Sequence, residues 1–343
     1  MNTTYKVILS GCLEFGTQRS FDQVFKFYEH RTENYYRNDI LFKAEEVFDP
    51  ETFTLNIPRY INNECPEKRW KNTLNLLEYV SQYAVAGDVK AWVIGGGKPV
   101  IDRVIEPSGD KSATQAFLEG RELIHKSGME EEAMKALNKA IDKFERHALA
   151  YERRGHINFT LRNFDDALYD FSKSIDINPN HPDAYWGRAN TYLVKKEYKS
   201  ALADLEKAIK TSIPHQPIFW SARRLKGEIH LMLEEYKEAI FELKLVTKRQ
   251  FKSDDPNAKW QVRAMFNYGK ALFEVGEFNE AVKVFDKLLA MEQEGKMIPP
   301  KEQQYYYRAL AKKNAGEGGY LSDLKEAATL GSEEASAMLE SLA

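Results

Sequence analysis

The sequence predicts a mainly helical protein in which a small α+β segment precedes a long array of paired helices. Up to about residue 106, β-branched and aromatic runs of strand length alternate with helical patterns. From residue 112 onward the apolar spacing is helical, and one pattern returns several times, as in "NFDDALYDFSKSIDINPN" and "EYKSALADLEKAIKTSIP". We therefore expect an α+β domain over residues 1–106, a linker over 107–112, five helical repeats over 113–300, and a degenerate repeat with a helical cap over 301–343.

Composition restricts the class of protein. Hydrophobic residues make up 43% and charged residues 29% of the 343 positions, which is typical of a soluble, folded chain. The formal net charge is −3, so no overall positive field attracts nucleic acid or anionic lipid. No apolar run approaches the roughly 20 residues of a membrane helix, and the first residues lack a secretory signal pattern. We expect a cytoplasmic protein that does not bind membranes, with nucleic acid disfavoured as a partner.

The α+β segment is expected to form seven elements. "YKVILSG" is typical of a strand, and Ser20, with Gln23 at capping-box spacing, is expected to open a helix. "LFKAEEVF" and "TFTLNIP" follow as strands around the turn-prone "DPE", and a second helix is entered at Pro66. "VKAWVI" and "PVIDRVIE" form a hairpin around "GGGK". The order β-α-β-β-α-β-β predicts a small sheet with two helices on one face, ferredoxin-like with an added edge strand.

In the helical part, a small residue and an alanine recur 12 residues apart in four copies and 13 apart in the first. Two antiparallel helices approach closely only where side chains are small, so we expect the small residue of the first helix to receive the alanine of the second. One such pair cannot cover its own apolar face, so neighbouring pairs must stack. The small residue and alanine of each copy are Gly120 and Ala133, Gly155 and Ala167, Ala189 and Ala201, Gly227 and Ala239, and Gly269 and Ala281.

These positions resemble the tetratricopeptide repeat (TPR) family. The family pattern of aromatic, small, alanine, aromatic, small and proline residues is met by Tyr151, Gly155, Ala167, Phe171, Ser174 and Pro179. The resemblance extends from near residue 113 to the C-terminus and implies a right-handed superhelix, or solenoid, of antiparallel helix pairs. It also implies a scaffold that binds a protein or peptide in its concave groove.

No motif indicates catalysis. "GGGK" lacks the upstream glycine and the following Ser or Thr of a phosphate-binding loop. The seven histidines include no pair at i, i+4, and Cys12 and Cys65 have no partner at metal-ligand spacing. We expect no enzymatic activity, no metal site and no cofactor.

The partner-binding groove is predicted from helical geometry. Residues one position after and three before each small residue should face the groove. A large ring such as Trp186 on an inner face needs a neighbour or a ligand. Among relatives that grip a peptide's C-terminal carboxylate, Asn190 matches the asparagine position, but Trp186 stands where they have lysine. The predicted groove residues are Phe117, Arg121, Glu152, His156, Trp186, Asn190, Arg224, Glu228, Phe266 and Lys270.

Two alternatives concern the N-terminal sheet. Strand aromatics such as Tyr5, Phe15, Phe42 and Trp92 could stack on RNA bases. The domain could also bind a small ligand or have an unrecognised activity, with the repeats positioning it. Core packing explains the same rings. Self-association through this sheet is also left open, and the sequence does not identify the partner of the repeats.

Overall fold

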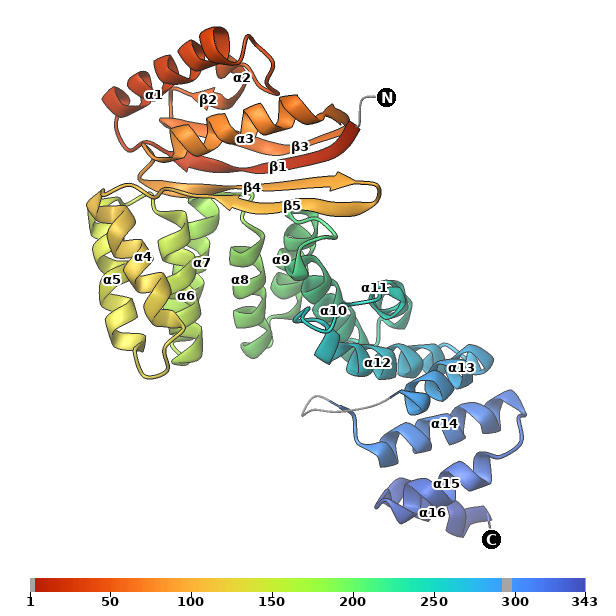
Figure 1. Cartoon of the computed structure of the whole chain (residues 1–343). Coiled ribbons are helices and arrows are strands. Elements are labelled where there is room, and N and C mark those ends of the chain that lie inside the picture. Colours follow the sequence, from red (N-terminus) through yellow and green to blue (C-terminus); the bar gives the residue numbers. More distant parts are fainter. Residues whose placement is uncertain (1–3, 292–297, 343) are drawn as a thin grey trace. The chain divides into compact units, whose positions relative to one another are not determined.

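A computed structural model describes residues 4–291 and 298–342 of the chain (Figure 1). The chain forms two compact units, Met1–Thr191 and Tyr192–Ala343. The first unit contains the α+β part and the helices that follow it directly. The second contains the remaining helices. Helix α8 (Pro182–Val194) crosses from one unit into the other.

Apart from the short helices η1 and α2, the α+β part has the predicted element order. Its sheet has the strand order β2-β3-β1-β4-β5, and every neighbouring pair is antiparallel. Strands β1 to β4 therefore have the ferredoxin-like arrangement, and β5 is the added edge strand. The elements are β1 (Thr4–Glu14), α1 (Gln18–His30), η1 (Arg31–Tyr35), α2 (Ala44–Val47), β2 (Phe48–Asp49), β3 (Thr54–Pro66), α3 (Glu67–Ser81), β4 (Ala86–Gly95) and β5 (Lys98–Ile105).

One face of this sheet carries the core of the α+β part. Helices α1 and α3 lie over that face (Figure 1). Alternate residues of β1, including Val7, Leu9 and Leu13, are fully buried beneath them, as the period of two in a strand requires. The buried Tyr28 of α1 donates its hydroxyl to the carbonyl of Phe42 at 2.9 Å, which satisfies its one polar group.

Two local expectations for this part were wrong. The segment predicted as a strand before "DPE" forms the short helix α2, and only Phe48 and Asp49 pair with β3. The amide of Lys43 donates to the Glu46 carboxylate at 2.8 Å, so a capping box starts a helix there. Helix α1 begins at Gln18 rather than at Ser20. Thr17 is its N-cap and accepts the Ser20 amide at 3.2 Å.

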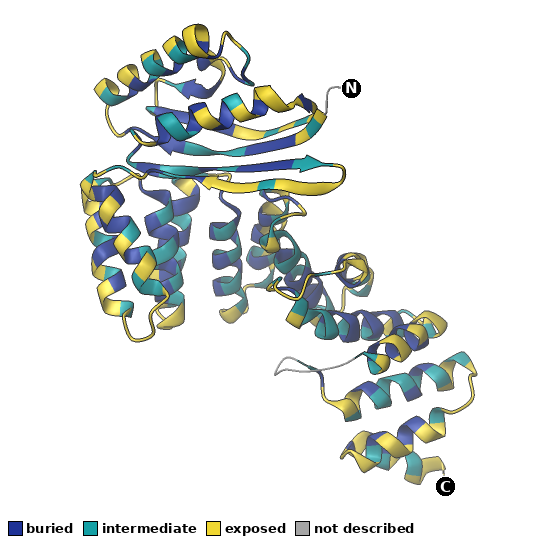
Figure 2. Cartoon of the chain, viewed as in Figure 1, coloured by how far each residue is buried: buried dark blue, intermediate teal, exposed yellow. Residues whose placement is uncertain are grey.

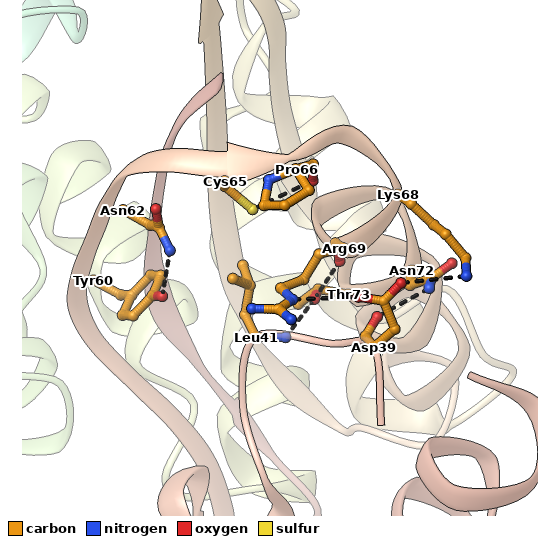
Figure 3. Close-up of polar contacts among 10 residues, drawn as sticks. All are labelled: Asp39, Leu41, Tyr60, Asn62, Cys65, Pro66, Lys68, Arg69, Asn72 and Thr73. Atoms are coloured by element: carbon orange, nitrogen blue, oxygen red, sulfur yellow. Dashed lines mark hydrogen bonds and ion pairs between the residues drawn. The ribbon is translucent and has the colours of Figure 1, made fainter. Parts of the chain in front are cut away.

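The connection before α2 is held against α3 by polar contacts (Figure 3). Asp39 pairs with Lys68 and Arg69, each at 3.3 Å. The hydroxyl of Thr73 accepts the amide of Leu41 at 2.9 Å. This segment has no strand partner, so these contacts supply the hydrogen bonds that a ladder would otherwise give.

The helical part follows as successive antiparallel pairs. In the first unit, α4 contacts α5 and α6 contacts α7, and in the second, α10 contacts α11, α12 contacts α13 and α14 contacts α15. The elements are α4 (Ser112–Ile124), α5 (Glu130–Lys143), α6 (Ala148–Thr160), α7 (Phe164–Ile177), α8, α9 (Tyr198–Thr211), α10 (Pro217–Met232), α11 (Tyr236–Lys248), η2 (Ala258–Trp260), α12 (Gln261–Glu274), α13 (Phe278–Ala290), α14 (Lys301–Ala315), α15 (Tyr320–Thr329) and α16 (Glu333–Leu342).

The small residues of the repeats lie at close helix contacts. Their partner is larger than we expected from the sequence. A methyl group added at Gly155 would lie 3.0 Å from the ring of Phe171, and one at Gly269 would lie 2.7 Å from the ring of Phe285. Each ring lies four positions after the repeat alanine. The five repeat alanines Ala133, Ala167, Ala201, Ala239 and Ala281 are all fully buried.

Candidate functional site

Helix α4 carries the first two predicted groove residues, and both contact neighbouring parts of the first unit. Phe117 is buried, and its ring centre lies 4.7 Å from that of His147. The guanidinium of Arg121 binds both carboxylate oxygens of Glu106, at 2.6 and 3.0 Å. Glu106 directly follows β5, so this pair ties the first repeat to the end of the sheet.

Helix α6 carries Glu152 and His156, which bind each other. Glu152 is 1% exposed, and its carboxylate lies 2.8 Å from Nε2 of His156 and 3.2 Å from Nε of Arg153. Burial by itself would raise the pKa of Glu152, but the ion pairs with His156 and Arg153 lower it to about 2. This carboxylate is therefore ionised and already paired.

Helix α8 carries Trp186 and Asn190, which are half-buried. The ring centre of Trp186 lies 6.3 Å from that of His156 on the preceding repeat. The Asn190 amide donates to the carbonyl of Trp186 at 2.7 Å, within its own helix. The rings of His156 and Trp186 therefore link α6 and α8, the first helices of two successive repeats.

Strand β4 lies against the starts of these helices. It contacts α6 directly, and Nζ of Lys90 lies 3.4 Å from the carboxylate of Asp183 near the start of α8. The hydroxyl of Thr114 in α4 donates to the carbonyl of Val85, just before β4, at 3.1 Å. Figure 2 shows β4 as largely buried and half-buried, whereas β5 is mostly exposed. The sheet is therefore an intramolecular neighbour of the first repeats.

The aromatic residues of the RNA-binding alternative pack inside the protein, and two of them, Phe15 and Phe42, lie outside the strands to which we assigned them. Phe15, Phe42 and Trp92 are buried. Tyr5 packs edge-on against Trp70, with ring centres 5.8 Å apart. None of these four residues is exposed, so none presents a ring on which an RNA base could stack. The structure gives the RNA alternative no support.

The glycine cluster between β4 and β5 forms a hairpin turn, as predicted. Gly95 pairs with Lys98, and the two residues between them, Gly96 and Gly97, have φ angles of 58° and 76°. Two consecutive positive φ angles are typical of a type I′ turn, which glycine adopts without strain.

In the second unit, the predicted residues of α10 form part of a larger cluster of cations around a tryptophan. Arg224 and Glu228 are buried and paired at 2.8 Å. The guanidinium of Arg224 lies 4.2 Å from the ring centre of Trp260, and that of Arg263 lies 5.9 Å from it. Arg263 also lies 3.6 Å from the Glu228 carboxylate. One buried carboxylate thus fixes two arginines beside one indole ring.

The predicted residues of α12 continue this surface toward α14. Nζ of Lys270 lies 4.8 Å from the ring centre of Tyr307, and Phe266 packs edge-on against the same ring at 5.6 Å. Phe266 is buried, so its ring has a protein neighbour. We call the whole set the inner cluster: Arg224, Glu228, Trp260, Arg263, Phe266, Lys270 and Tyr307.

Three members of the inner cluster were not predicted from the sequence: Trp260, Arg263 and Tyr307. Arg263 lies three residues before Phe266 and seven before Lys270, so extending the predicted stripe by one helical turn would include it. Trp260 lies in the single 3₁₀ turn η2 before α12, where a count along the α-helix does not apply. Tyr307 belongs to the degenerate sixth pair, to which the repeat spacing was not extended.

Within residues 4–291 and 298–342, no cluster of three or more His, Cys, Asp or Glu side chains could hold a metal ion. In the same residues, no helix has both the length and the apolar character needed to cross a membrane.

Comparison with known proteins identifies the repeats. The family model described as anaphase-promoting complex, cyclosome, subunit 3, matches residues 160–245, and two tetratricopeptide repeat models match residues 131–182 and 262–294. No curated protein sequence matches the chain significantly.

Two solved structures show the same fold at low identity. YrrB, described as a TPR protein with an unusual peptide-binding site, is 20% identical, with a TM-score of 0.52 over 61% of this chain and 99% of YrrB. PilF of Pseudomonas aeruginosa is 14% identical, with a TM-score of 0.50 over 68% of this chain and 98% of PilF. The matching models therefore show tetratricopeptide repeats at residues 131–182 and 262–294 of this chain, and the helix-pair architecture agrees with them.

Proposed function

We propose that this chain is a non-catalytic scaffold whose repeats bind a protein or peptide partner, with the inner cluster as the main contact of the second unit. The observation that carries the proposal is the grouping of Arg224, Arg263 and Lys259 within 6.0 Å of the ring centre of Trp260. Tryptophan and arginine are the residue types most enriched at binding hot spots. Because Glu228 holds both arginines, little side-chain entropy remains to be lost on binding.

The chemistry of the cluster indicates the class of partner. Its half-buried side chains, Trp260, Arg263, Lys270 and Tyr307, are cationic and aromatic. A segment with both acidic and apolar side chains therefore fits it, bound extended or as a helix. In the first unit, Phe117, Arg121 and Glu152 are already paired inside the protein. Trp186 and Asn190 are the residues there that we propose as further contacts.

The test begins with affinity purification of the partner from the native cell. Arg224 and Phe266 are buried, so truncating them would also weaken folding, and the half-buried pair Arg263 and Lys270 is the better target. We expect the Arg263→Ala/Lys270→Ala variant to bind the purified partner at least about tenfold more weakly by calorimetry, which is roughly 1.4 kcal/mol.

A matched control distinguishes the loss of a direct contact with the partner from a general effect of net charge. Lys139→Ala/Lys325→Ala removes the same charge at two exposed positions on α5 and α15 and should leave the affinity unchanged. Circular dichroism should show equal helix content in all variants. An unchanged affinity for the Arg263→Ala/Lys270→Ala variant would remove the inner cluster from the binding site.

A further inference from the structure

A second concave site lies between α11, α12 and α13. It is a hollow of about 530 Å³ with a partly apolar floor that includes Met265 and Val284, both buried. Among the described residues that line it, five carry cationic side chains and one, Glu280, carries a carboxylate. We call this site the basic pocket, after its cations Lys244, Lys248, Arg249, Lys283 and Lys287.

The basic pocket and the inner cluster lie on opposite sides of α12. Met265 and Tyr268 line the pocket, whereas Phe266 and Lys270 belong to the inner cluster. Successive residues of an α-helix turn by about 100°, which places these two pairs roughly 150° apart around the helix axis. One small ligand cannot therefore occupy both sites.

The spacing of the pocket lysines lowers the stability of the helices that carry them. Lys244 and Lys248 are i, i+4 neighbours on α11, and Lys283 and Lys287 are i, i+4 neighbours on α13. Like charges at this spacing repel each other and destabilise a helix. Glu280 lies 3.4 Å from Lys283, but both side chains are at least half exposed, so this ion pair contributes little.

Three of the remaining cations, Lys244, Lys248 and Lys287, form no ion pair within residues 4–291 and 298–342. The net charge of the whole protein is −3, so this concentration of positive charge does not reflect its overall composition. An uncompensated cationic hollow attracts an anionic ligand and raises its local concentration.

One edge of the pocket is held in place by two contacts. Gln261 donates its side-chain amide to the backbone carbonyl of Arg249 at 2.7 Å. The guanidinium of Arg249 lies 5.5 Å from the ring centre of Trp220. The turn after α11 is therefore fixed before a ligand arrives, which lowers the entropy cost of binding.

We propose that the basic pocket binds an acidic segment of a protein partner, in which carboxylates flank an apolar side chain. Four of the five cations are lysines, which act as mobile point charges, whereas tight recognition of a phosphate favours the planar fork of arginine. The apolar floor accepts an aliphatic side chain, which inorganic phosphate does not offer. This site is separate from the inner cluster and adds a second contact for a partner.

The test uses the full-length protein and a fluorescein-labelled peptide, Glu-Glu-Leu-Glu-Glu, with fluorescence anisotropy as the measurement. We expect binding that weakens as salt rises, because the ion pairs are solvent-accessible. Lys244→Glu/Lys287→Glu should weaken binding at least about tenfold, and Lys244→Gln/Lys287→Gln should weaken it less. The peptide Lys-Lys-Leu-Lys-Lys should not bind at this site.

Three comparisons decide the outcome. Lys139→Glu/Lys325→Glu makes the same change in net charge on exposed positions of α5 and α15, and it should leave binding intact. Because the inner cluster also fits acidic and apolar side chains, the pocket variant is measured again in the Arg263→Ala/Lys270→Ala background, where it should still weaken binding at least about tenfold. The proposal is overturned if the Lys139→Glu/Lys325→Glu variant loses as much affinity as the pocket variant, or if the pocket variant has no effect in that background. It is also overturned if inorganic tripolyphosphate binds at the pocket and the acidic peptide does not, or if neither binds.

Discussion

The guanidinium of Arg154 and the carboxylate of Asp170 join the two helices of one repeat, with Nη2 2.6 Å from Oδ1. Asp170 is 1% exposed and also accepts a hydrogen bond from Asn158 at 3.0 Å. In the second unit, Arg308 and Asp323 form the same kind of pair at 2.5 Å. In each pair, the arginine of the first helix supplies the counter-charge and hydrogen bonds of a buried carboxylate on the second helix.

We expect Asp170→Asn to lower the free energy of unfolding by about 1–3 kcal/mol, because Arg154 would lose its counter-charge while remaining mostly buried. Urea denaturation followed by circular dichroism measures this change. Asp166→Asn, at an exposed position in the first turn of the same helix, is the matched control and should cost less than about 1 kcal/mol. Equal effects from the two variants would show that the buried pair adds nothing specific.

The ring of Phe171 also predicts the effect of enlarging a glycine. A methyl group added at Gly187 would overlap this ring, so Gly187→Ala should cost about 1–3 kcal/mol through overpacking. That cost exceeds the roughly 1 kcal/mol that alanine gains over glycine in a helix. Thermal melts should show a lower midpoint for this variant.

Two further variants identify the cause of that loss. Phe171→Leu in the Gly187→Ala background should recover part of the stability, because a smaller side chain leaves room for the methyl group. Gly318→Ala, at a position with no neighbouring atoms within 4 Å, should not lower the midpoint. A stable Gly187→Ala variant would contradict the packing described for this repeat.

The stability of the protein should depend on pH through His147. Burial lowers the pKa of His147 from 6.5 to about 4, while Nδ1 accepts the amide of Ala150. Between these two values the unfolded chain binds more protons than the folded chain. The contribution is therefore fully present above pH 6.5 and is lost as the pH falls toward 4, by about 3 kcal/mol in total.

Stability measured in urea between pH 7 and 4 tests this dependence. His147→Asn keeps a side-chain acceptor at the helix start and removes the titrating group, so its stability should fall less steeply over the same range. His125→Asn changes an exposed histidine and should keep the original slope. If His147→Asn and the parent lose stability in parallel, another group causes the dependence.

The parts of the fold that follow from residue periodicity were predictable. The β-branched and aromatic runs of the strands and the repeated small-residue and alanine spacing are local patterns, and the element order and the helix pairs follow from them. The strand predicted ahead of "DPE" was wrong because Lys43 and Glu46 form a helix cap, which outweighed the apolar pattern of the segment. A cap of this kind needs only two residues, so it hardly changes the apolar pattern of the longer segment from which the strand was predicted.

The candidate site was less predictable because it depends on tertiary contacts. Helical counting placed Glu152 on the inner face, but it could not show that His156 and Arg153 lie 2.8 and 3.2 Å from its carboxylate. It also could not bring Trp260 beside Arg224, because the two residues are joined only through the packing of α10, η2 and α12. Whether the predicted residues contact a partner stays a prediction.

The exposed edge of the N-terminal sheet has a consequence for aggregation. Strand β5 ends the sheet on one side, and a free edge of this length is a template for adding a strand from another molecule. Pro99 offers no backbone N–H to such a strand, and the charged side chains of Lys98, Asp102 and Arg103 are exposed along this edge, which opposes its burial. We therefore expect this edge to resist the addition of a strand from a second copy of the chain.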